Sequence, residues 1–149
     1  MKALFVTTET NETPKYAESF ASLGHEVKHY IFSHRRIQNA KEGTALDGEI
    51  HSLALQFQPQ IIVYLGACMG IMPSTELWVR LNHEAAPTVL MVSDAGDLGC
   101  PWHPLIRNYD RKDAFACVVA IDGQRLWETS ERQITLLTPI DPKHFPEPP

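Results

Sequence analysis

The stretch QIIVYLG (60–66) is apolar at almost every position and rich in β-branched residues. A strand with this composition is typical of the interior of a parallel sheet that has helices on both faces. Two later stretches, PTVLMVSD (87–94) and AFACVVAID (114–122), show the same nearly continuous pattern. We therefore expect these three segments to be central strands of one sheet.

Three further segments complete the predicted sheet, namely KALFVTT (2–8), HEVKHYIF (25–32) and QITLLTP (133–139). The second of them alternates between apolar and polar residues, as an edge strand does. Between the strands, apolar residues recur at helical spacing, at Tyr16, Phe20 and Leu23 and again at Leu46, Ile50, Leu53 and Phe57. The sequence thus predicts the α/β class, with a Rossmann-like, open, mostly parallel sheet of about six strands and helices on both faces.

Several residues mark where the helices begin and end. Thr44 and Asp47 have the spacing of a capping box, and Pro73 and Ser74 stand directly before the periodic stretch TELWVRLNHEA. Gly24 follows an amphipathic stretch, where a helix C-cap belongs. We expect one helix to begin at Thr44, another to begin at Ser74, and a third to end at Gly24.

The length of 149 residues is that of one domain, which we place at residues 1–140. The proline-rich segment 141–149 is predicted to be a C-terminal tail or linker. The three cysteines have no CxxC spacing and are expected to be reduced thiols. No disulfide framework is predicted.

The charge and the hydropathy of the sequence limit the binding partners and the cellular locations that we expect. A formal net charge of -5 argues against a sequence-independent grip on nucleic acid, which requires clustered Lys and Arg. No apolar stretch approaches the roughly twenty residues that span a bilayer, and no signal-peptide pattern follows Met1. We expect a cytoplasmic protein that has no membrane span and does not bind nucleic acid.

In open parallel sheets, ligands bind beyond the carboxyl ends of the strands. The first segment in such a position is TTETNETP (7–14), whose hydroxyls at Thr8 and Thr10 resemble those of the flavodoxin phosphate loop T-x-T-G-x-T. This spacing makes FMN the alternative to a protein without a cofactor. Asn11 replaces the glycine, and a hydroxyl-rich helix cap is the other interpretation of the segment. The motif G-x-G-x-x-G is absent, so NAD is not predicted.

Two further segments supply candidate ligand contacts. Arg35 follows the second predicted strand and has the fork geometry that binds phosphate or carboxylate, although a solvated loop charge is the alternative. Gly66 and Gly70 follow the third strand and permit either a close approach of the backbone to a ligand or a tight turn. We include all three among the predicted ligand-binding residues.

The segment SDAGDLGCPWHP (93–104) follows the fourth strand and contains more residues with catalytic or ligand-binding side chains than the other segments. Asp94 and His103 are predicted as candidate general bases, with Asp97 and Trp102 as ligand contacts, since an indole face stacks on a sugar ring. The alternative is that the two aspartates cap a turn. A metal site made of these residues and Cys100 would lack a second Cys or His hook, so no metal is predicted.

The order of four motifs resembles the N-terminal domain of GT-B glycosyltransferases, and most closely family 4-like enzymes and their uncharacterised relatives. These motifs are LGHEV (23–27), QPQIIVYLG (58–66), APTVLMVSDAGD (86–97) and LLTPIDPKHF (136–145). The resemblance implies that the chain binds the sugar acceptor and that Asp94 takes the position of the general base. It also implies a donor-binding domain, in cis or in trans.

Two features depart from the family pattern. The turn after the first strand is TTETNET rather than glycine-rich, and no second, donor-binding domain follows in the sequence. The chain is therefore expected to be either a piece of a longer transferase or a free-standing relative, and to be inactive in transfer by itself. A flavodoxin-like electron carrier and a non-enzymatic module for small-molecule binding or protein interaction are the alternatives. A homodimer is left open.

Overall fold

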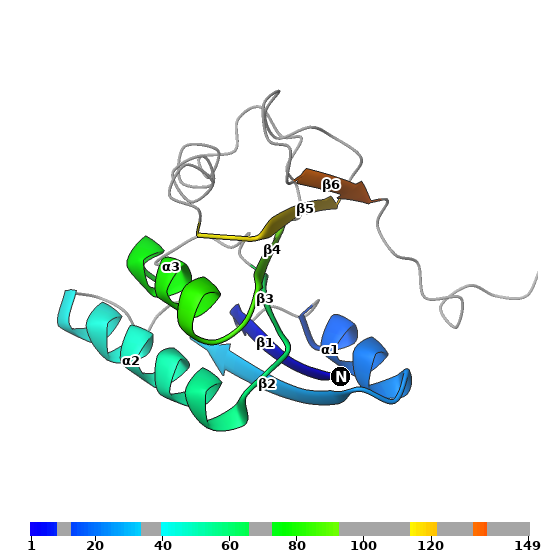
Figure 1. The fold of residues 1–149 in the computed structure, drawn as a ribbon, viewed down its shortest axis with the longest axis horizontal. Coiled ribbons are helices and arrows are strands. Elements are labelled where there is room, and N and C mark those ends of the chain that lie inside the picture. The colour runs from blue at the N-terminus through cyan, green and yellow to red at the C-terminus, as the bar shows by residue number, and fades with distance from the viewer. Residues whose placement is uncertain (9–12, 34–39, 66–72, 93–113, 122–132, 137–149) are drawn as a thin grey trace, which may run out of the picture.

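In the part of the chain that the structure describes, six parallel strands form one open sheet in the order β2-β1-β3-β4-β5-β6. The computed structural model describes residues 1–8, 13–33, 40–65, 73–92, 114–121 and 133–136 (Figure 1). The strands are β1 (Lys2–Thr8), β2 (Glu26–Phe32), β3 (Ile61–Leu65), β4 (Thr88–Val92), β5 (Cys117–Ile121) and β6 (Gln133–Leu136). The helices are α1 (Thr13–Ser22), α2 (Ala40–Phe57) and α3 (Thr75–Glu84).

Each of the six segments predicted to be a strand contains one, so the predicted Rossmann-like α/β class is confirmed. The three nearly continuous apolar segments became β3, β4 and β5, which all lie inside the sheet, and the alternating segment became the edge strand β2. β1 is also internal, because it pairs with β2 on one side and β3 on the other. Every pair of described strands is parallel.

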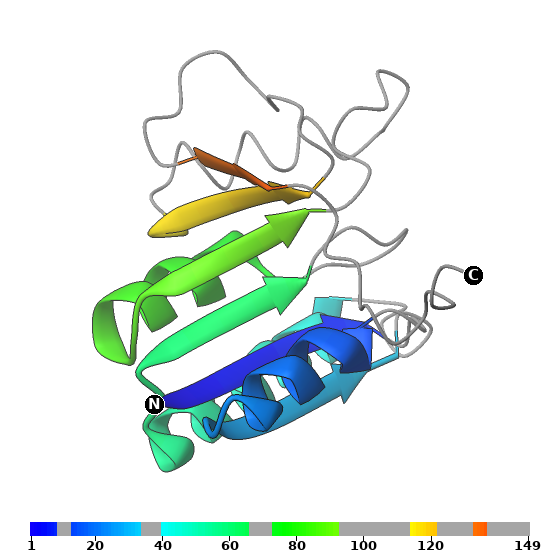
Figure 2. The ribbon, with the colours of Figure 1, turned by 90° about the vertical axis from the view of Figure 1, so that its right-hand side faces the viewer.

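The helices cover both faces of the sheet, as predicted. Figure 1 shows α2 and α3 on one side and α1 on the other, and Figure 2 shows α1 in front of β1. The side chains of β1 alternate between the two layers, since Ala3 and Phe5 pack with Ala17 of α1, whereas Leu4 and Val6 belong to the larger core under α2 and α3. This two-sided burial explains why the interior strands are apolar at successive positions.

Three aromatic rings pack against one another at the centre of the larger core. The ring centroids of Tyr64 and Trp78 lie 4.4 Å apart, and Phe115 lies 5.5 Å from Trp78. All three side chains are buried. Because the rings come from β3, α3 and the residues before β5, they join α3 to these two strands. The apolar area that each ring buries contributes strongly to the stability of the fold.

The prediction of a capping box at Thr44 and Asp47 is wrong. α2 begins at Ala40, so both residues lie inside the helix. The Asp47 carboxylate instead accepts a hydrogen bond from the backbone N–H of Ser74 at 3.1 Å, which ties α2 to the start of α3. The prediction for Ser74 is confirmed, because its Oγ accepts from the backbone N–H of Leu77 and caps α3.

At the end of α1, one prediction from the sequence is confirmed and another is wrong. Gly24, the second residue after the helix, has a φ of 82° and donates its N–H to the Ala21 carbonyl, as a glycine at a helix C-terminus does. Leu23 was predicted to continue the apolar face of the helix, and this is wrong, since 73% of it is exposed. The reason is that α1 ends at Ser22, so Leu23 falls in the turn and leaves the helical face.

The predicted tail, residues 141–149, lies outside the described residues. Within the described ranges, no helix combines the length and the apolar character needed to cross a bilayer.

Candidate functional site

The strand order reverses at β1, and this reversal locates the candidate site. From β1 the chain continues to β2 on one side, and β3 occupies the other side. Connections that run in opposite directions from neighbouring strands leave a crevice beyond their carboxyl ends, where open α/β sheets bind ligands. Thr7 pairs with Leu65 and Leu65 pairs with Met91, so the carboxyl ends of β1, β3 and β4 lie next to one another.

Of the predicted site residues, only the backbone of Thr8 belongs to the described part of the chain, as the last residue of β1. The others lie outside the described residues, namely Thr10, Arg35, Gly66, Gly70, Asp94, Asp97, Trp102 and His103. In sequence, each of these residues follows a described strand that ends at the same edge of the sheet: β1, β2, β3 or β4. Asp94 is two residues beyond the end of β4 at Val92.

A partly buried polar pair lies close to this edge and was not predicted from the sequence. The hydroxyl of Thr7, which is fully buried, lies 2.7 Å from Nε2 of His29 on the neighbouring strand β2. The tautomer of the imidazole decides which of the two groups donates. The contact ties the carboxyl end of β1 to β2 on the face that α1 covers.

The surroundings of His29 favour its neutral form. Desolvation by burial lowers the pKa of the imidazole below its usual value, and the negative charge of Glu18 on α1 opposes this effect in part. A neutral imidazole keeps one donor and one acceptor nitrogen, which suits a hydrogen bond to a hydroxyl. The alternation in HEVKHYIF already placed His29 on one face with Val27 and Ile31, but its partner Thr7 depends on the strand register.

An open groove of about 750 Å³ runs between β2 and α2. One wall is formed by Lys28 and Tyr30 of β2, and the other by the small residues Ala45, Gly48 and Ser52 of α2. The hydroxyl of Tyr30 donates to Oε2 of Glu49 at 2.6 Å, across the groove. The groove follows the edge strand, so it is separate from the crevice at the carboxyl ends of β1 and β3.

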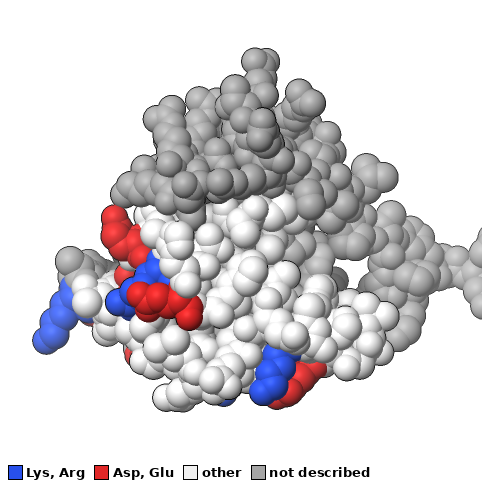
Figure 3. All heavy atoms as spheres, viewed as in Figure 1, with Lys and Arg blue, Asp and Glu red and all other residues white. Residues whose placement is uncertain are grey.

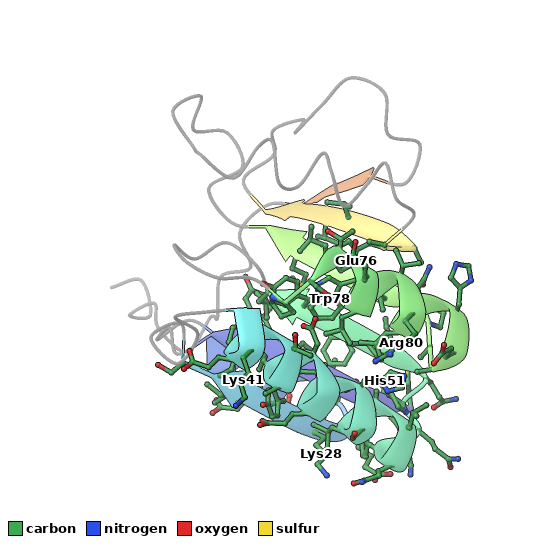
Figure 4. The ribbon with its side chains drawn as sticks, turned by 90° about the vertical axis from the view of Figure 1, so that its left-hand side faces the viewer. Lys28, Lys41, His51, Glu76, Trp78 and Arg80 are labelled. Carbon is green, nitrogen blue, oxygen red and sulfur yellow. The ribbon has the colours of Figure 1, made fainter. Side chains whose placement is uncertain are left out.

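The contact between α2 and α3 is polar at its surface and aromatic underneath. Nε2 of His51 lies 3.0 Å from Oε2 of Glu84, and Figure 4 shows His51 on α2 facing α3. Below them, Nε1 of Trp78 is buried and has no hydrogen-bond partner among the described residues. The described residues contain no group of three His, Cys, Asp or Glu side chains placed to hold a metal.

The charges on the described surface are mixed. The face in Figure 3 carries Lys or Arg beside Asp or Glu, with uncharged surface between these groups. Among the described residues, Lys2 and Glu26 form an ion pair whose charged atoms lie 3.7 Å apart. The described residues of this face therefore form no basic patch of the kind that follows a phosphodiester backbone.

No protein-family model matches the chain, and a search of curated proteins found no match either. Among solved structures, the chain is similar to an F420-dependent methylene-tetrahydromethanopterin dehydrogenase in complex with methylene-tetrahydromethanopterin and coenzyme F420. The sequence identity is 14% and the TM-score is 0.48. The match covers 80% of this chain but only 41% of the dehydrogenase, so the chain spans less than half the length of that protein.

Proposed function

We propose that this chain is the acceptor-binding half of a glycosyltransferase and binds a sugar-like ligand beyond the carboxyl ends of β1, β3 and β4. The observation that carries the proposal is the position of these three ends, which are adjacent in one parallel sheet. Every segment that supplies a predicted contact follows β1, β2, β3 or β4, and the motif order that resembles GT-B enzymes supports a sugar as the ligand. Asp94 or His103 then takes the proton from the acceptor hydroxyl while a donor-binding domain, in cis or in trans, presents the activated sugar.

Ligand-observed NMR on the isolated chain tests the binding step with a panel of mono- and disaccharides. We expect at least one saccharide to show saturation transfer, and Trp102→Ala to abolish it by removing the stacking surface. Trp78→Phe is the matched control, because Trp78 lies in the core under α3. If no saccharide binds, or if both variants lose binding equally, the sugar site is wrong.

The catalytic step requires the chain together with a donor-binding domain. Asp94→Asn and His103→Ala are each expected to keep acceptor binding, and the variant that removes the base should lower the transfer rate by about 10²–10⁴-fold. Unchanged transfer in both variants would show that neither residue is the base.

A flavodoxin-like FMN site is the second candidate, and the strand order favours it. The order β2-β1-β3-β4-β5 is the one in which flavodoxin-like folds hold FMN between β1 and β3. In this case the hydroxyls of Thr8 and Thr10 hold the phosphate at the start of α1. Titration with FMN should then quench flavin fluorescence, and Thr10→Val should weaken binding. A protein that leaves the fluorescence of added FMN unchanged excludes this candidate.

A further inference from the structure

The outer edge of β2 has main-chain groups that no described strand pairs. The backbone N–H of Glu26 donates to the carbonyl of Met1, so Glu26 and alternate residues after it direct their main-chain groups toward β1. The N–H and C=O groups of Val27, His29 and Ile31 therefore point away from the sheet. Figure 2 shows β2 as the lowest strand of the sheet, and no described strand pairs with its outer edge.

This edge has few of the features that usually prevent strand pairing. β2 is seven residues long, contains no proline, and keeps an unbroken register with β1, so it has no bulge. Ile31 is 50% exposed on this strand. A regular edge strand with an exposed apolar side chain is a template for another strand.

We propose that β2 pairs antiparallel with β2 of a second copy of this chain, across a two-fold axis at His29. His29 is the central residue of the strand, so this register pairs both strands over their full length. It also sets the outward groups of Val27, His29 and Ile31 opposite one another, as antiparallel hydrogen bonding requires. A shift by one residue would oppose outward groups with inward ones.

On the α1 face, the register brings apolar side chains together. Ile31 of each copy lies opposite Val27 of the other, and this pairing covers the side chain that is exposed in the single chain. His29 meets its own copy at the axis, but its ring is bonded to Thr7 and is held toward β1. The cross-strand contacts on this face are thus made mainly by the β-branched side chains of Val27 and Ile31.

On the α2 face, the register brings opposite charges together, which argues for a second copy rather than another partner. Lys28 of one copy lies opposite Tyr30 of the other, whose hydroxyl already binds the Glu49 carboxylate. The incoming side chains enter the groove beside Ala45 and Gly48, and a Cβ added at Gly48 would meet nothing within 4 Å. Lys28, otherwise a residue that discourages edge pairing, gains a carboxylate partner.

Sedimentation equilibrium tests the dimer directly. We expect a mass of twice 16.8 kDa at micromolar concentration, and at least a tenfold rise in the dissociation constant for Ile31→Lys. Leu55→Lys makes the same kind of change at an exposed apolar residue of α2 outside the groove and should leave the dimer intact. Circular dichroism confirms that each variant is folded. A monomeric wild-type protein, or equal weakening by both variants, overturns the proposal.

Mixing two charge variants tests the contact between copies. Lys28→Glu and Glu49→Lys each place like charges together in their own dimer, so each alone should raise the dissociation constant about tenfold. An equimolar mixture restores opposite charges in both contacts and should form a heterodimer close to wild-type affinity. A mixture that stays as weak as the separate variants contradicts the proposed register.

Oxidative cross-linking tests the position of the axis. Residues in a hydrogen-bonded antiparallel pair have Cα atoms about 5.5 Å apart, within disulfide range, so His29→Cys should cross-link to its own copy. Glu26→Cys lies opposite Phe32 and should not exceed the wild-type background from the native cysteines. Cross-linking of Glu26→Cys but not of His29→Cys would overturn the two-fold at His29.

Discussion

The contact between Thr7 and His29 shows how one register decides the chemistry of a single residue. His29 is half-buried beside the Thr7 hydroxyl of β1, and the negative charge of Glu18 on α1 acts on it. Burial lowers the pKa of the imidazole, so the folded protein holds it neutral at a pH where the unfolded chain binds a proton. This difference couples the stability of the protein to pH.

We predict that His29 makes the free energy of unfolding fall as the pH is lowered below 6.5, its ordinary pKa. Between this value and the lower pKa of the folded state, only the unfolded chain gains a proton, so acid favours unfolding. Below the folded-state pKa both states bind the proton, so His29 lowers the free energy of unfolding no further. Urea unfolding at a series of pH values from about 7.5 to about 5 measures the effect.

The variant His29→Gln should show a weaker dependence on pH in this window, because glutamine does not titrate. Glu18→Gln should show a stronger one, since the Glu18 charge raises the pKa of His29 and its removal lowers that pKa further. Identical pH profiles for the wild type and His29→Gln would mean that His29 does not carry the effect.

At the scale of elements, α2 and α3 owe their ends and their packing to different causes. α3 starts where Ser74 caps it, which the sequence indicates directly. α2 starts at Ala40, ahead of the spacing that resembled a capping box, and the carboxylate of Asp47 serves the neighbouring helix instead. The serine N-cap thus marked the start of α3 correctly, whereas the spacing of Thr44 and Asp47 misplaced the start of α2.

We predict opposite effects of alanine at two glycines. Gly48→Ala should stabilise the protein by about 0.5–1 kcal/mol, because alanine favours the helix and the added Cβ meets open space. Gly24→Ala should destabilise it by about 1–2 kcal/mol, since its φ of 82° is strained for a residue with a Cβ. Chemical denaturation of both variants measures the difference, and changes of the same sign would contradict it.

The N-cap of α3 gives a separate prediction. Ser74→Ala removes the hydroxyl that accepts from the backbone N–H of Leu77 and should cost about 1 kcal/mol. Ser52→Ala is the matched control, as Ser52 lies exposed in the middle of α2, where alanine is the better helix former. The midpoint of thermal unfolding compares the two, and an equal loss would show that the cap contributes nothing specific.

At the scale of the whole molecule, the internal strands of the sheet differ from its edge strand β2 in how their backbone groups are paired. β1 and β3 are paired on both sides, and their side chains pack into both cores. β2 is paired on one side only and is the proposed site of dimerisation. The protection of backbone amides from hydrogen exchange should follow this arrangement.

We predict that the amides of β1 and β3 exchange slowly at any protein concentration. The amides of Val27, His29 and Ile31 should become protected only as the protein is concentrated, because the dimer supplies their acceptors. Exchange followed by NMR at two concentrations measures this. Protection of these three amides that does not depend on concentration would contradict pairing between copies.

The candidate site was predicted from the sequence only as far as strand ends can be recognised. Asp94 and Gly66 were chosen because each follows a strongly apolar segment. β3 does end directly before Gly66, and β4 ends two residues before Asp94. Their roles as base and ligand contact stay predictions. The Thr7–His29 pair could not be predicted, because residues 22 positions apart meet only once β1 and β2 are aligned.

By itself the sequence determined the α/β class, the positions of six strands, and that β3, β4 and β5 lie inside the sheet, whereas the internal place of β1 was not predicted. These properties are local, because burial on one face or on both dictates the hydrophobic pattern of a segment. The tertiary structure decided the strand order with its reversal at β1, the buried Thr7–His29 contact, and the groove beside the free edge of β2. These features depend on which distant segments pack together and in what register, and no single stretch of sequence encodes that.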